Sequence, residues 1–229
     1  MGHPSIVFSQ VPASQVSESR PGPPAVYGSG PARLYTRHEG GLISRALGTA
    51  VHTLLEELAR LRLTLEWEAA RATLVHFEPR IAAQVRAVGV EQSQAARVAV
   101  QALQLALSAS RDPIGSWILS PHRSAASEAG WAGVVAGVLR AVRVDRVFQA
   151  GPTPGSKGED CWWIIDYKTA HADHVDPARA LPMLRALFAP QVEAYGEVLR
   201  NLHGADARGC TIRAGLYYPR MALLDWWEL

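Results

Sequence analysis

Apolar residues recur at two different spacings along the chain, and the change of spacing separates helical from strand-forming regions. In residues 42–65 the apolar positions are three or four residues apart, which predicts an amphipathic helix. Residues 77–110 continue this spacing and predict two helices that meet near Gly89. Residues 142–148 and 162–169 are compact runs of β-branched and aromatic residues on either side of a polar loop, which predicts a hairpin of two strands.

The region after this hairpin predicts one helical stretch and then two strands. We expect the helix to be interrupted by Pro182 and Pro190 and to stop at His203-Gly204, because proline lacks the helical N–H and glycine favours helix C-termini. Residues 211–219 and 223–227 predict a further strand and an edge strand. A strand, helix, strand crossover implies a mixed sheet, so the predicted class is α/β, a central mixed β-sheet flanked by helices.

Composition limits the domain organisation and the compartment. The 229 residues, 48% of them hydrophobic, are enough for one sizeable domain, which we place at residues 41–229. Residues 1–40, rich in Pro, Ser and Gly, predict a flexible tail or linker. Only two cysteines, Cys161 and Cys210, argue against a disulfide scaffold and against the four thiolates of an iron–sulfur cluster. With no secretory leader and no long apolar run, we expect a cytoplasmic protein without a membrane segment.

Charge leaves the function open, whereas one strand carries candidate chemistry. The net charge of +2 permits nucleic-acid binding without requiring it. Asp166 and Lys168 follow a strand that is apolar on both faces, and period 2 places them on one face. Burying them is costly unless an ion-pair partner, a metal ion or a phosphate compensates. Lys168 is also one of only two lysines among 23 basic residues, and a compact ammonium can contact a single water or phosphate oxygen.

Four ordered motifs resemble a known family. Residues 144–146, Val-Asp-Arg, and residues 166–169, Asp-Tyr-Lys-Thr, resemble the metal-binding hairpin of the PD-(D/E)XK nuclease superfamily, although Val142 stands where the family has glycine. The helix with Gly-Thr-Ala-Val-His at residues 48–52 and the Gln191–Tyr195 spacing complete the set. More narrowly, the motifs resemble the RecB-type nuclease domain at the C-terminus of UvrD-like (AddA/RecB) helicases.

The resemblance implies a fold, a cofactor and a set of site residues. The fold is a restriction-endonuclease-like core with an N-terminal helical extension, in which residues 77–110 form a helical insertion. The activity is cleavage of DNA by a Mg²⁺- or Mn²⁺-dependent exonuclease in double-strand-break repair, with a UvrD-like helicase in the same longer chain or as a separate subunit. Each site residue then takes a role: metal ligands His52, Asp145, Asp166 and the carbonyl of Tyr167; catalytic groups Asp145, Asp166, Lys168 and Gln191; substrate contacts Tyr195 and Gly48.

Several alternatives stay open on the sequence. Glu128 lies in residues 117–131, which we expect to return the chain to the sheet. The resembled family often has a Glu there, ahead of its first core strands, which makes Glu128 a candidate site residue, but we favour a surface role. The His and Asp residues at 171–176 are more typical of a polar loop than of a metal cluster. Competing functions are a catalytically inactive module for DNA-end binding or subunit docking, and a small-molecule α/β enzyme.

Overall fold

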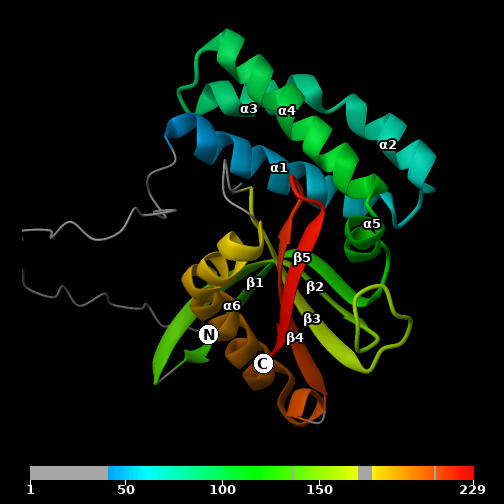
Figure 1. The fold of residues 1–229 in the computed structure, drawn as a ribbon, viewed down its shortest axis with the longest axis vertical. Coiled ribbons are helices and arrows are strands. Elements are labelled where there is room, and N and C mark those ends of the chain that lie inside the picture. The colour runs from blue at the N-terminus through cyan, green and yellow to red at the C-terminus, as the bar shows by residue number, and fades with distance from the viewer. Residues whose placement is uncertain (1–40, 136, 170–176, 209) are drawn as a thin grey trace, which may run out of the picture. The chain divides into compact units, whose positions relative to one another are not determined.

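A computed structural model describes residues 41–135, 137–169, 177–208 and 210–229 of the chain. They fall within one compact unit, Leu34–Leu229. In Figure 1 the first helices gather on one side of a twisted sheet and a long later helix lies on the other.

Five helices precede the sheet: α1 (Leu42–Leu61), α2 (Trp67–Val75), α3 (Glu78–Ala87), α4 (Gln92–Arg111) and α5 (Pro113–Leu119). The helix predicted over residues 42–65 is therefore confirmed as α1, and the pair predicted over residues 77–110 as α3 and α4. Gly89, at φ +95°, separates this pair in a conformation that side chains rarely adopt. Helix α2 was not predicted; its residues include Thr73 and Trp67, whose helical preference is weak.

The sheet has five strands: β1 (Arg123–Val135), β2 (Val138–Ala150), β3 (Cys161–Tyr167), β4 (Thr211–Tyr218) and β5 (Leu223–Glu228). They lie in the order β1-β2-β3-β4-β5, and β3 and β4 are parallel while the other neighbours are antiparallel. Helix α6 (Pro177–Arg208) lies between β3 and β4 in sequence. The mixed sheet with helices on both sides confirms the predicted fold class.

Alternation along β3 builds two hydrophobic cores, one on each face of the sheet. Trp163, Ile165 and Tyr167 pack into the core formed with helices α1 to α5. Trp162 and Ile164 pack into the core formed with α6. Because a strand turns successive side chains to opposite faces, a fully buried central strand must be apolar on both. The charged C-terminal end of this strand therefore lies between two hydrophobic cores.

Residues 117–119 correct one prediction, because they end a helix and do not begin a strand. Asp112 accepts a hydrogen bond from the N–H of Gly115 at 2.8 Å and Pro113 occupies the first turn, a combination that starts a helix. The chain enters the sheet only at Arg123, as β1. The apolar run at residues 117–119 fits a short buried helix as well as a strand, so local pattern did not distinguish them.

Helix α6 corrects a second prediction, because it runs unbroken past Pro182 and Pro190 and continues beyond His203-Gly204 to Arg208. Each interior proline costs about 3 kcal/mol in a helix. Burial of a large apolar side chain contributes about 1.5–3 kcal/mol. The helix buries a stripe of five side chains against the sheet: Leu184, Phe188, Val192, Tyr195 and Leu199. Their combined burial outweighs the cost of the prolines.

Candidate metal centre

The candidate site forms where α1 lies against the middle of β2 and the end of β3. His52 projects from α1, Asp145 from β2, and Tyr167 ends β3. A Cβ placed on Gly48, one turn before His52, would lie 3.4 Å from the hydroxyl oxygen of Thr169, so the helix packs closely against the segment that follows β3. The tertiary fold therefore brings the Gly-Thr-Ala-Val-His motif at residues 48–52 into contact with the Asp-Tyr-Lys-Thr motif at residues 166–169.

His52 and Asp145 are linked both directly and through the backbone of Tyr167. Nδ1 of His52 lies 3.4 Å from Oδ1 of Asp145. Nε2 of His52 lies 3.0 Å from the carbonyl oxygen of Tyr167, and the N–H of Tyr167 donates to Oδ2 of Asp145 at 2.7 Å. These three contacts fix the positions of the His52 imidazole, the Asp145 carboxylate and the Tyr167 carbonyl relative to one another. All three groups are among the four predicted metal ligands.

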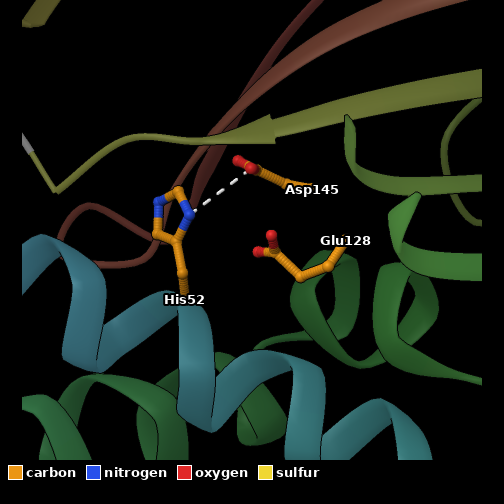
Figure 2. Close-up of side chains that lie close together, drawn as sticks. All are labelled: His52, Glu128 and Asp145. Carbon is orange, nitrogen blue, oxygen red and sulfur yellow. Dashed lines mark ion pairs between the residues drawn. The ribbon is translucent and has the colours of Figure 1, made fainter. Parts of the chain in front are cut away.

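Glu128 joins this group from β1. The register pairs Ser127 with Arg146 and Ala129 with Val144, so Glu128 lies opposite Asp145. One ligand atom each from His52, Glu128 and Asp145 lies within 4.8 Å of the others, and Figure 2 shows the three side chains pointing toward one another. The preference for a surface role was wrong, since the Glu128 side chain is 17% exposed and is ion-paired with Arg143.

The backbone at Glu128 departs from ordinary strand geometry. Its φ of +51° is in the left-handed region, where a residue with a side chain carries strain. Such conformations persist where the surrounding structure enforces them, often at functional sites. Here the flanking pairs with β2 enforce it on both sides.

Asp166 and Lys168 form the adjacent part of the site. The two side chains are ion-paired and are 4% and 16% exposed, and the ammonium lies 4.2 Å from the centre of the Phe188 ring on α6. Oδ2 of Asp166 is buried, and it is the oxygen that pairs with the ammonium of Lys168. The carboxylate of Asp166 is outside the group of three, but it acts electrostatically on both His52 and Asp145.

Burial and like charge shift two pKa values in the site upward. Burial raises the pKa of Asp166 to about 6, with the negative charge of Asp145 adding to the rise and the ammonium of Lys168 opposing it. Burial alone would lower the pKa of His52, but the hydrogen bond and charge of Asp145, with the charges of Asp166 and Glu128, outweigh it and raise that pKa. The site therefore concentrates negative charge that protons or a cation can offset.

The donor set fits a divalent cation. Carboxylate and carbonyl oxygens are the ligands that Mg²⁺ and Mn²⁺ prefer, and a neutral imidazole is an accepted additional ligand. His52, Glu128 and Asp145 supply this set. The Tyr167 carbonyl contacts the other ring nitrogen of His52, Nε2, and the carboxylate of Asp166 is paired with Lys168.

Gln191 and Tyr195 lie on α6, on the other side of Lys168. Their side chains are hydrogen-bonded to each other. Together with Arg140 and Arg143 of β2 they line a groove of about 750 Å³. Arg143 also pairs with Glu128, so this ion pair connects the groove to the metal-ligand group.

Arg146 of the Asp-Arg motif serves the fold. Its guanidinium is buried and donates to the carbonyl oxygens of Ile118 and Ser120 at 3.2 and 2.9 Å and to the hydroxyl of Ser127 at 3.1 Å. It therefore satisfies the C-terminal carbonyls of α5 and fixes this helix to β1. The His and Asp residues at 171–176, treated above as a polar loop, lie outside the described residues.

A mixed sheet that brings a candidate metal-ligand group next to an aspartate–lysine pair is typical of metal-dependent phosphodiesterases. The chain belongs to the PD-(D/E)XK nuclease superfamily, whose family model matches residues 26–224. Enzymes of this superfamily typically use a divalent metal ion. No curated protein matches the chain. Among the described helices, none combines the length and the apolar character that crossing a bilayer requires.

Proposed function

We propose that the chain is a Mg²⁺- or Mn²⁺-dependent deoxyribonuclease of the RecB type. The observation that carries the proposal is the convergence of His52, Glu128 and Asp145 beside the ion pair of Asp166 and Lys168. Residues from α1, β1, β2 and the end of β3 meet there, and the ordered motifs of the RecB-type domain account for four of these five side chains. A small-molecule enzyme is disfavoured, because the groove beside the site is open and lined by two arginines.

The chain's own groups can perform the steps of phosphodiester hydrolysis. His52, Glu128, Asp145 and the Tyr167 carbonyl would hold the metal ion, and Asp166 would add a carboxylate. A bound divalent cation supplies Lewis-acid polarisation of a phosphate oxygen and lowers the pKa of a water. Lys168 would orient the attacking water or offset the negative charge that develops as the new O–P bond forms and the ester bond breaks. Gln191 and Tyr195 would position the substrate from α6.

Digestion of end-labelled single- and double-stranded DNA tests the activity, with Mn²⁺ or Mg²⁺ present. Asp166→Ala and Lys168→Ala should abolish cleavage. The matched controls are Asp160→Ala and Lys157→Ala, since both residues are exposed near the loop between β2 and β3. Cleavage that survives both site substitutions would reject the site, and a parent protein that binds DNA ends without cleaving them would favour the inactive docking module.

The same assay addresses the proposed role in double-strand-break repair. A RecB-type exonuclease that depends on a helicase should shorten labelled single strands from an end by itself. It should digest long blunt duplex only when a UvrD-like helicase and ATP are added. Cleavage within circular single-stranded DNA would instead assign endonuclease action and exclude the dependence on ends.

A further inference from the structure

The alternation of side chains is interrupted at the same level in β1 and β2. Two pairs of residues that are three apart pack against the same core beside α6: Val144 and Val147 of β2, and Ala126 and Ala129 of β1. Strict alternation would turn residues three apart to opposite faces of the sheet. Glu128, at φ +51°, lies within the interruption in β1, and Asp145 lies within the one in β2. The regular pleat of the strand therefore does not fix the direction of the Glu128 side chain.

Arg143 reaches Glu128 diagonally across the two strands. The register pairs Arg143 with Gly130, and Glu128 lies two residues before Gly130. Diagonal neighbours of this kind are within reach of long side chains. Nothing lies within 4 Å of the position that a Cβ on Gly130 would take, so the Arg143 side chain has room to lean toward Glu128. Nε of Arg143 donates a hydrogen bond to Oε2 of Glu128, and the two side chains form an ion pair.

This hydrogen bond engages one oxygen of the carboxylate and leaves the other to a cation. It joins Nε to Oε2, whereas an ionised carboxylate offers lone pairs on both of its oxygens. Glu128 contributes a ligand atom to the group that it forms with His52 and Asp145. Carboxylates that bind metal ions are commonly hydrogen-bonded by an outer partner, and loss of that partner weakens metal binding about 10- to 100-fold.

The charge of Arg143 acts in the opposite direction, because a guanidinium repels a cation. The Arg143 side chain is 72% exposed, so water and salt screen this repulsion. The Glu128 side chain is only 17% exposed, so water does not readily replace the donor that Arg143 supplies. We therefore expect the orienting hydrogen bond to outweigh the repulsion.

We propose that Arg143 is a positioning residue of the metal centre, whose Nε–H holds the Glu128 carboxylate directed toward His52 and Asp145 (Figure 2). The proposal rests on the metal-dependent function proposed above. It assigns to Arg143 a role that acts through Glu128.

Two substitutions of matched size separate the hydrogen bond from the charge. Arg143→Gln places an amide N–H where Nε lies, whereas Arg143→Met places a methyl group there, and both remove the charge. Mn²⁺ is titrated into the metal-free full chain, and the free ion is measured by its electron paramagnetic resonance signal. Arg143→Met should weaken Mn²⁺ binding about tenfold, and Arg143→Gln should bind nearly as the parent does. The control Arg140→Met, which removes an exposed charge from the same strand, should leave Mn²⁺ binding unchanged.

A double-mutant cycle tests whether Arg143 acts through Glu128. In a Glu128→Ala background, Arg143→Met should cause no further loss of Mn²⁺ binding. Binding by Arg143→Met that equals or exceeds that of the parent, equal losses for Arg143→Met and Arg143→Gln, or the same loss in the Glu128→Ala background would each overturn the proposal.

Asp145→Asn separates a failure of this role from a failure of the proposed function. Mn²⁺ binding that Asp145→Asn weakens and Arg143→Met does not would refute the role of Arg143 and retain the metal centre. Mn²⁺ binding that Asp145→Asn leaves unchanged would refute the metal centre, and with it both proposals.

Discussion

The buried carboxyl group of Asp166 leads to a specific prediction about stability in the absence of metal. Burial raises its pKa from 3.8 to about 6. The folded protein therefore holds this proton more tightly than the unfolded chain does. The stability gained from protonation is complete below pH 3.8 and is lost as the pH rises through about 6. The contribution of Asp166 thus stabilises the metal-free protein as the pH falls from 8, which is the opposite of the usual effect of a salt-bridged carboxylate.

The size of the effect follows from linkage. At pH 5 the folded carboxyl group is mostly protonated while the unfolded one is still mostly ionised, so the gain relative to pH 8 is about 1 kcal/mol. For a chain of this length this corresponds to a rise in Tm of about 2–4 °C. His52 adds to the effect in the same direction, because its raised pKa gives stability that is present below pH 6.5 and lost as the pH rises further.

Thermal unfolding followed by circular dichroism in EDTA, from pH 8 to pH 5, measures this gain. Asp166→Asn removes the titrating group and should reduce the gain by about 1 kcal/mol, whereas Asp160→Asn, at an exposed position, should not. Equal pH dependence of the parent and Asp166→Asn would refute the buried, metal-free carboxyl as described. Because protons and a cation compete for the same groups, added Mn²⁺ should stabilise the protein more at pH 8 than at pH 5.

Three further predictions concern the metal ligands and the packing around them. At one hundred times its Kd, Mn²⁺ should stabilise the parent by about 2.7 kcal/mol. Glu128→Gln should need a higher Mn²⁺ concentration for the same rise in Tm. If Glu128→Gln and the exposed control Glu159→Gln need the same Mn²⁺ concentration, Glu128 is not a ligand. Arg146→Met should lower the free energy of unfolding in urea by about 3 kcal/mol or more, because it leaves the buried carbonyls of Ile118 and Ser120 without a donor. The control is Arg86→Met, at an exposed position. A loss for Arg146→Met no larger than that of the control would show that Arg146 does not fix α5. Gly115→Ala should lower the free energy of unfolding by about 2 kcal/mol or more, since the added Cβ would lie 2.3 Å from the carbonyl oxygen of Ala109. Gly41→Ala, with open space around it, should leave the free energy of unfolding nearly unchanged. Similar urea midpoints for the two variants would contradict the packing described.

Glu128 shows why part of the site could not be predicted from the sequence. Asp145, Asp166 and Lys168 stand next to a strongly apolar strand pair, so local pattern and motif spacing were enough to single them out. Glu128 enters the site only because β1 pairs with β2 in one register. The turn pair Val135–Val138 sets that register and places Glu128 opposite Asp145. A prediction that recognised the turn at Gly137, whose φ is +77°, would have found this partner.

The sequence by itself determined the α/β class, the two faces of β3, the chain order of the motifs and the rarity of lysine. These properties depend on side-chain period and residue type, which act locally. Tertiary structure alone decided that α6 runs unbroken through two prolines, that residues 117–119 are helical, and that Arg146 supports α5. It also decided which side chains surround the Tyr167 carbonyl. The physical reason is that burial energy and cross-strand register join residues far apart in the chain, and both can outweigh local preference.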